Sequence, residues 1–156
     1  MTYSDQALSR FSGASNCAQS ILETYLPRVG IPEATATALG AGLGGGLGGS
    51  QETCGALNGG CIVLSYGCAA GGGGRSRDPK EQVAALVERF REEFGSARCR
   101  DLLGYDRNDP AAVAAAPPDA KDICPRCVGF VAHALDNVLD EVPDQVPEVP
   151  TDEEGG

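Results

Sequence analysis

Residues 54–68 read CGALNGGCIVLSYGC, and this stretch decides the fold. It is apolar on nearly every side, which is typical of a helix buried among other helices. Its glycines lack side chains, so neighbouring helices can approach closely. We therefore expect a central helix here, and the rest of the chain should supply the helices that cover it.

Apolar residues recur at helical spacing on both sides of this segment. The clearest case starts at Asp78 and Pro79, a typical helix start, and ends at Gly95. The same reasoning predicts helices over residues 16–29, 32–39, 79–94, 96–103 and 125–141. Residues 105–122 are expected to form an irregular or partly helical connection. No pair of β-strands and no internal repeat is evident, so we predict an all-α, single-domain bundle of five or six helices.

Three segments do not fit a helical pattern. Residues 40–50, GAGLGGGLGGS, form a glycine-rich loop that allows close backbone approach. Residues 69–78, AAGGGGRSRD, are expected to form a flexible surface loop. Residues 142–156 mix proline with acids and should form a disordered acidic tail. We therefore predict a helical domain over residues 1–141, followed by this tail.

The net charge of -10 is concentrated at the C-terminal end. Eight of the 22 acids lie at or beyond Asp136, where no Lys or Arg follows, so residues 1–135 carry 14 acids against 12 bases. A nearly neutral body offers no binding surface for nucleic acid or an anionic membrane. The start of the chain lacks a signal-peptide pattern and no long apolar run occurs, so we expect a cytoplasmic protein that does not enter the membrane.

Seven cysteines in such a chain do not indicate an extracellular disulfide framework, because the cytosol keeps thiols reduced. Cys17, Cys54, Cys99 and Cys124 each fall at the start of a different predicted helix. A helix N-terminus presents unpaired N–H groups and partial positive charge, which stabilise a thiolate. The plainer interpretation, that each cysteine is a small buried apolar residue, is weaker for four such positions together than for any one alone.

The other cysteines support different interpretations. Cys61 and Cys68 follow Cys54 at intervals of seven, which favours helix packing. Cys127 completes Cys124-Pro125-Arg126-Cys127, a CxxC pair that can form a reversible disulfide or bind metal. His133 is the single histidine, and a surface role is the more ordinary one for it.

Glycines next to these cysteines are candidate cofactor-binding positions. Gly45 and Gly46 can bring backbone amides against a cluster or thiolate at Cys54, and Gly55 follows that cysteine directly. The tract also matches GxGxxG, but no strand precedes it as a dinucleotide fold requires, so NAD binding is not expected.

Several motifs resemble the C_GCAxxG_C_C family, whose members are regarded as redox-active. The matching segments are Asn16-Cys17-Ala18-Gln19, the glycines 44–46, the stretch ETCGALNG at 52–59, CRDLLG at 99–104, and Cys124-Pro125 followed by Val128. The resemblance spans about residues 11–139 and implies a redox role for the family's four cysteines, which fall on Cys17, Cys54, Cys99 and Cys124. Cys61, Cys68 and Cys127 depart from the family pattern.

Three hypotheses follow for the chemistry. The first is an iron-sulfur cluster held by Cys17, Cys54, Cys99 and Cys124 for electron transfer or redox sensing. The second is a metal-free thiol-disulfide protein, with Cys124 and Cys127 as the reacting local pair. The third is a structural zinc site, although the usual paired ligand spacing is missing. Each redox hypothesis requires a redox partner protein or a small-molecule reductant, and the sequence leaves the oligomeric state open.

Overall fold

The chain is an all-α domain in a computed structural model that describes residues 1–69 and 78–139. Within these ranges there are eight α-helices and two short 3-10 helices. Their bounds are α1 Tyr3–Ser12, α2 Cys17–Tyr25, η1 Leu26–Val29, α3 Glu33–Gly40, α4 Gly55–Ala69, α5 Pro79–Phe94, α6 Cys99–Leu103, α7 Pro110–Ala115, η2 Ala120–Asp122 and α8 Ile123–Leu139. The prediction of an all-α bundle is confirmed. Helices α1 and α7 raise the number above the five or six expected.

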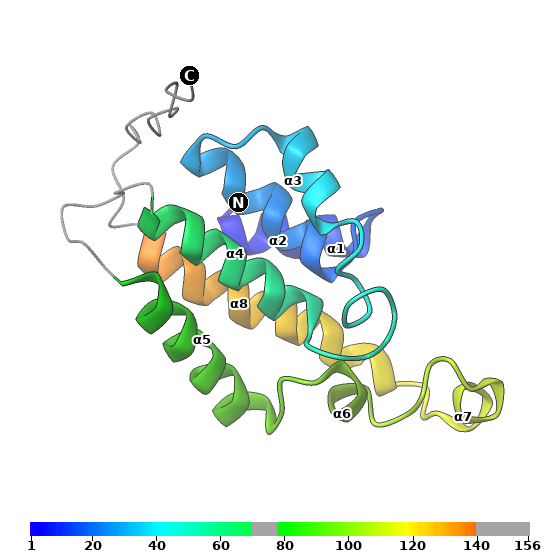
Figure 1. Cartoon of the computed structure of the whole chain (residues 1–156). Helices are drawn as coiled ribbons and strands as arrows, with labels where there is room; N and C mark the ends of the chain where they lie inside the picture. The colour runs from blue at the N-terminus through cyan, green and yellow to red at the C-terminus, as the bar shows by residue number, and fades with distance from the viewer. Residues whose placement is uncertain (70–77, 140–156) are drawn as a thin grey trace, which may run out of the picture.

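Helix α4 is the central element, as the apolar segment predicts. It packs against α2, α5 and α8 (Figure 1). Two glycines bring these neighbours close: a methyl group at Gly59 would meet Ile21 of α2 at 3.1 Å, and one at Gly60 would meet Val131 of α8 at 2.6 Å. The core therefore depends on small residues in α4 and larger aliphatic residues on the surrounding helices.

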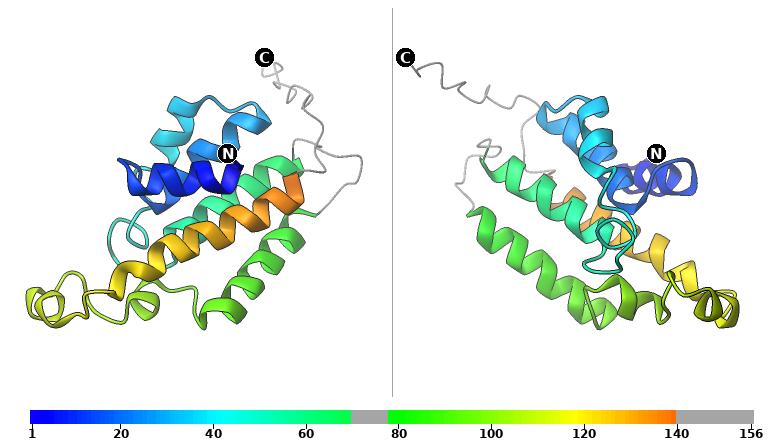
Figure 2. Two further views of the ribbon diagram at one scale, coloured as in Figure 1. Left: turned by 180° about the vertical axis from the view of Figure 1, so that it is seen from behind. Right: turned by 45° about the vertical axis from the view of Figure 1, so that its right-hand side comes forward.

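Helices α4 and α8 lie side by side and run in the same direction (Figures 1 and 2). Their N-terminal ends lie at one end of the bundle, next to α6 and the glycine-rich loop. Helices α1, α2 and α3 cover one side, while α5 packs on α4 and α8 from the other. This arrangement brings several helix starts to the same end of the molecule.

Local chemistry explains where predicted and observed helix bounds differ. The predicted helix 16–29 changes to the 3-10 form at Leu26, because Pro27 lacks the N–H that an α-helix would use there. Helix α6 starts at Cys99 rather than residue 96, since Arg98 forms an antiparallel bridge with Thr53. Helix α5 has the predicted Asp78 cap and the left-handed Gly95 at its end.

The predicted disordered tail lies outside the described residues, as does the predicted loop except for its two end residues, Ala69 and Asp78. None of the helices in the described ranges has the combined length and apolar character needed to cross a bilayer.

Candidate functional site

Five cysteines gather at the end of the bundle where the helix starts meet. Cys17 and Cys99 are the first residues of α2 and α6, and Cys54 immediately precedes α4. Cys124 lies in the first turn of α8, with Cys127 one turn later. These thiols are close enough to interact electrostatically, because Cys17, Cys54 and Cys99 all contribute to raising the pKa of Cys124. The structure therefore places the four cysteines singled out by sequence in one group, and adds Cys127.

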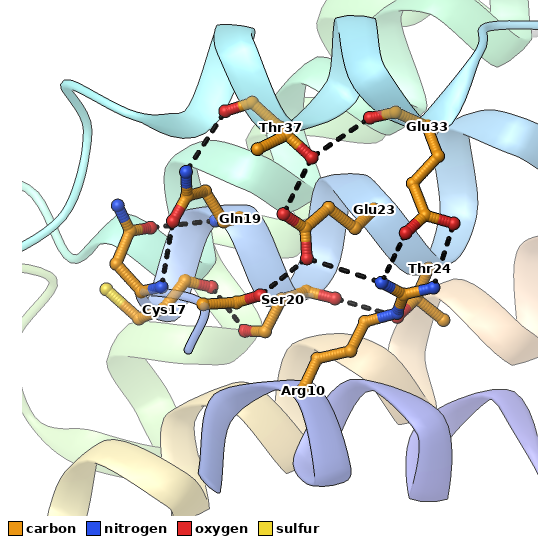
Figure 3. A network of polar contacts seen from close by, with 10 residues as sticks. Arg10, Cys17, Gln19, Ser20, Glu23, Thr24, Glu33 and Thr37 are labelled. Atoms are coloured by element: carbon orange, nitrogen blue, oxygen red, sulfur yellow. Dashed lines mark hydrogen bonds and ion pairs between the residues drawn. The ribbon is translucent and has the colours of Figure 1, made fainter. Parts of the chain in front are cut away.

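The start of α2 is held by a capping box. The Asn16 side chain accepts the Gln19 N–H at 2.8 Å, and the Gln19 side chain accepts the Asn16 N–H at 3.0 Å. Both amides also reach α3, because Asn16 Nδ2 donates to Gly40 O and Gln19 Nε2 donates to Thr37 O, each at 3.1 Å. Figure 3 shows the bond from Gln19 to Thr37. These bonds fix the first turn of α2, and with it Cys17.

A buried carboxylate one turn further along α2 strengthens this support (Figure 3). Glu23, only 6% exposed, accepts hydrogen bonds from Ser15 Oγ at 2.5 Å and Thr37 Oγ1 at 2.9 Å. Arg10 of α1 lies 3.4 Å from the same carboxylate and forms a second ion pair with Glu33 at 2.9 Å. These hydrogen bonds and ion pairs thus connect α1, α2 and α3 next to the turn that carries Cys17.

The glycine-rich loop wraps around the thiols in a left-handed conformation. Residues 45–49 all have positive φ, which glycine adopts readily and other residues adopt at a cost. The Gly45 N–H donates to the Cys17 sulfur. A methyl group at Gly46 would lie 2.8 Å from the Cys99 Cβ and 2.7 Å from the Glu52 nitrogen. The loop therefore supplies an amide donor to Cys17, and Gly46 leaves room for Cys99.

Gly55 has a spatial role. A methyl group at this position would overlap the Cys17 sulfur, so only glycine allows that thiol to lie against the start of α4. The amide donors to Cys54 come instead from the next two residues, Ala56 and Leu57. Sequence reasoning expected the loop glycines to supply donors at Cys54, whereas the donor from Gly45 reaches Cys17.

Cys54 and Cys99 are joined by a short antiparallel backbone pairing. The Cys54 N–H donates to Ala97 O at 2.8 Å, and the Cys99 N–H donates to Glu52 O at 2.7 Å. Thr53 and Arg98 form the bridge between them. This pairing fixes the two cysteine backbones relative to one another although they are far apart in sequence.

Cys54 and Cys127 form a hydrogen-bonded thiol pair. The Cys127 S–H donates a hydrogen bond to the Cys54 sulfur, and the Ala56 and Leu57 amides donate to the same atom. These donors outweigh the opposing effect of burial and lower the pKa of Cys54 to about 7. The pKa of Cys127 is raised, first because its proton is held in the bond to Cys54 and second because the thiol is buried. Cys54 is thus the thiolate of the pair and Cys127 the thiol that supports it.

The other three thiols favour the protonated form. Burial, followed by the charge of Cys54, raises the pKa of Cys17. Burial and the neighbouring thiols likewise raise the pKa of Cys99, and that of Cys124 to about 11. These thiols are less reactive at neutral pH than Cys54.

Arg107 is a member of the site that sequence reasoning missed. Its positive charge opposes the rise in pKa at both Cys99 and Cys124. A side chain at Gly45 would overlap its guanidinium, so the group lies against the glycine loop. The Arg107 N–H donates to Gln51 Oε1 at 2.9 Å, and the buried Gln51 side chain also donates to Tyr105 O at 3.0 Å. No local motif around Arg107 signals this role, because it depends on how the connection before α7 folds back.

The remaining candidates lie elsewhere. Cys61 faces a shallow groove on α4 with Ile62 and Tyr66, and burial raises its pKa to about 11. Cys68 lies near the other end of α4, and His133 is exposed on α8. All three lie further along α4 or α8 from the helix starts than the gathered thiols do.

The arrangement of the side chains argues against a site for a single metal ion. Across residues 1–69 and 78–139, no group of three or more His, Cys, Asp or Glu side chains is arranged to hold a metal ion. An iron-sulfur cluster makes a different demand, because its thiolate ligands bind separate iron atoms and stand further apart than the ligands of a single ion. Four neighbouring thiols with amide donors at Cys17 and Cys54 suit that demand chemically.

Comparisons with known proteins give one match. The family model described as "Putative redox-active protein (C_GCAxxG_C_C)" matches residues 15–138, which include all five gathered cysteines. No curated protein matches the chain, and no solved structure matches it. Because the match covers most of the sequence, from the cap of α2 to the last turn of α8, the chain belongs to the C_GCAxxG_C_C family of redox-active proteins.

Proposed function

We propose that the protein is a thiol-disulfide redox protein in which Cys54 and Cys127 cycle between a dithiol and a disulfide. The hydrogen bond between their side chains carries the proposal, because it makes each of these two thiols the largest influence on the pKa of the other. The sequence hypothesis paired Cys127 with Cys124. The contact across two helices now favours Cys54 as the partner.

The environment of Cys54 suits it to be the nucleophile of the pair. A pKa of about 7 leaves a large fraction as thiolate at neutral pH, and the thiolate is the nucleophile in disulfide exchange. Cys127 supplies the second sulfur of the bond. The amides of Ala56 and Leu57 stabilise the thiolate, which favours the reduced dithiol and makes the disulfide more oxidising than that of an unperturbed pair.

The partner is a redox protein or a small-molecule thiol, since a dithiol requires an external couple to exchange electrons. A reducing compartment such as the cytoplasm fits this cycle, because thioredoxin and glutathione there would restore the dithiol. We propose no role for nucleic acid.

The proposal is tested by oxidising the full chain with a small disulfide and mapping the product by mass spectrometry after blocking unreacted thiols. We expect one reversible bond between Cys54 and Cys127. Cys54→Ser and Cys127→Ser should each abolish it, while Cys61→Ser should leave it unchanged. A product linking other cysteines, or no intramolecular bond, contradicts the proposal.

A second candidate is an iron-sulfur centre held by Cys17, Cys54, Cys99 and Cys124. It is favoured by the mutual interaction of these four thiols at helix starts. The Gly45 amide at Cys17 would stabilise the charge of such a centre. The cluster would supply one-electron transfer. The four cysteines would bind its iron as thiolates, with iron replacing the proton on each sulfur.

This candidate requires an anaerobic experiment. Protein purified or reconstituted without air should contain iron and acid-labile sulfide and show visible charge-transfer absorption. Cys99→Ser should reduce both contents, and Cys61→Ser should not. Colourless protein without iron after reconstitution excludes the cluster and leaves the dithiol function untouched.

A further inference from the structure

We infer that Cys124 is the entry thiol of the site: an external low-molecular-weight disulfide that carries carboxylates reacts first at Cys124, and the oxidation passes through Cys127 to Cys54. This inference rests on the proposed Cys54–Cys127 couple and adds a route and a substrate class to it.

Burial separates the inner pair from solvent. Cys54 is 7% exposed and Cys127 is 2% exposed, whereas Cys124 is half-buried. A disulfide with bulky substituents needs an accessible sulfur for in-line attack. The residues that follow Cys124, Pro125 and Arg126, are exposed, so an approaching molecule meets little obstruction there. Access therefore assigns the first exchange to an outer thiol, although burial raises the pKa of Cys124 and leaves a smaller fraction of it ionised than of Cys54.

Among the outer thiols, Cys124 alone shares a helix with Cys127. The two are separated by three positions on α8, which places their side chains on one face of the helix. Among the thiols around Cys127, the electrostatic effect of Cys124 is second only to that of Cys54. Cys17 is held under the glycine loop by the Gly45 amide, and Cys99 lies on α6. Cys127 thus stands between one outer and one inner thiol.

The positive charge of Arg107 near Cys124 selects the class of disulfide that reacts there. Arg107 is exposed and its charge acts on both Cys99 and Cys124. Within residues 1–69 and 78–139 Arg107 forms no ion pair, whereas neighbouring Arg100 is paired with Asp106 at 3.1 Å. An unneutralised guanidinium beside the entry sulfur favours a disulfide bearing carboxylates over a neutral one.

The exchange is balanced at each step. The Cys124 thiolate attacks the external disulfide R–S–S–R, forms a mixed disulfide and releases one thiolate RS⁻. Cys127 then gives its proton to the released RS⁻, attacks the Cys124 sulfur as the thiolate and releases the second RS⁻. The Cys54 thiolate finally attacks the Cys127 sulfur, which leaves a Cys54–Cys127 disulfide and releases Cys124 as the thiolate with which it began. Overall two protein thiols are oxidised and one external disulfide is reduced to two thiols.

The experiment follows disulfide formation over time by acid quenching and mass spectrometry, with oxidised glutathione as the probe. Cys124→Ser should form the Cys54–Cys127 bond at least about tenfold more slowly than wild type, because the accessible route is lost. Cys61→Ser is the matched control, because Cys61 is a half-buried thiol on α4 that does not belong to the gathered group, and it should react at the wild-type rate. Cys127→Ser should stop at a glutathione adduct on Cys124.

Two further oxidants separate the effects of access and of charge. Diamide, a small uncharged oxidant, should oxidise Cys124→Ser and wild type at similar rates. A neutral disulfide such as hydroxyethyl disulfide should react more slowly than oxidised glutathione in wild type, and Arg107→Gln should remove that preference.

The outcomes separate this inference from the function on which it rests. If Cys124→Ser reacts with oxidised glutathione as fast as wild type, or if the adduct in Cys127→Ser lies on another cysteine, the entry route is wrong and the dithiol couple stands. Slow reaction of Cys124→Ser with diamide would also overturn the route, because it would show damage to the inner pair. If wild type forms no Cys54–Cys127 bond with any oxidant, the proposed function itself fails.

Discussion

Cys54 combines deep burial with a lowered pKa, two properties that normally oppose each other. Hydrogen bonds donated by Cys127, Leu57 and Ala56 more than offset the effect of burial on the pKa, because each of them favours the thiolate over the thiol. Position alone is therefore insufficient: Cys17 also lies at a helix start, yet burial keeps its pKa raised.

Removing the Cys127 donor, which contributes most to the lowered pKa of Cys54, should change the titration of Cys54. In Cys127→Ala, the pKa of Cys54 should rise above about 7, because the S–H donor is lost while the burial remains. At neutral pH the thiolate fraction then falls, and in wild type it should fall as the pH drops through 7. The measurement is a pH titration of ultraviolet thiolate absorbance, assigned by comparison with Cys54→Ser.

Cys61→Ala serves as the control for this titration. Its own pKa of about 11 keeps it protonated near neutrality, so the low-pH step should be unchanged. A step near pH 7 that survives in Cys127→Ala would show that the amides of α4 suffice by themselves.

At the scale of elements, α4 performs two tasks, since its start supports Cys54 and its small residues admit the neighbouring helices. Gly60 is the tightest point between α4 and α8, because a methyl group there would lie 2.6 Å from Val131 and 3.1 Å from Leu86. A change at this glycine therefore tests the packing away from the thiols.

We expect Gly60→Ala to destabilise the protein by about 1–2 kcal/mol, since overpacking a tight core costs about 1–3 kcal/mol and the gain in helix propensity offsets part of it. The measurement is urea unfolding followed by circular dichroism. Gly42→Ala is the matched control: nothing lies within 4 Å of its added methyl group, so its effect should stay within about 0.5 kcal/mol. Equal effects in the two variants would contradict the packing argument.

The helices that sequence predicted well carry both an end signal and an apolar stripe. For α5, Asp78 and Pro79 mark the start and Gly95 the end. Two others were missed for identifiable reasons. The Thr2 and Asp5 capping box that starts α1 is readable in the sequence, but α1 buries only Ala7 and so lacks a strong apolar stripe. Asp109 and Pro110 start α7 as Asp78 and Pro79 start α5, but α7 has no buried residues and hence no apolar stripe to reveal it.

The candidate site was predictable only in part. Helix-start signals located Cys17, Cys54, Cys99 and Cys124, because N-terminal positions leave a local pattern. The contact of Cys54 with Cys127 depends on the relative axial positions of α4 and α8, which no short motif encodes. Arg107 is placed by a long-range bond to Gln51, which is likewise invisible to pattern analysis.

At the scale of the whole molecule, the proposed disulfide would join the central helix to the last one. It would close a long loop that contains α4, α5, α6 and α7, and so reduce the entropy of the unfolded chain. We expect the oxidised protein to be more stable than the reduced protein by up to about 4 kcal/mol, measured as the difference in unfolding free energy in urea with and without reductant.

Cys127→Ser is the control for that measurement, because it cannot form the bond. Its stability should be the same under both conditions. A wild-type protein that is equally stable or weaker when oxidised would mean that the bond strains the packing between α4 and α8.

The backbone pairing between residues 51–54 and 97–100 has a consequence for following the site in solution. The amides of Cys54 and Cys99 are both committed to this pairing, so each can exchange with deuterium only when the two segments separate. Their protection factors would report local opening of the thiol centre as one event, and comparison with the core amides of α4 would distinguish that opening from global unfolding.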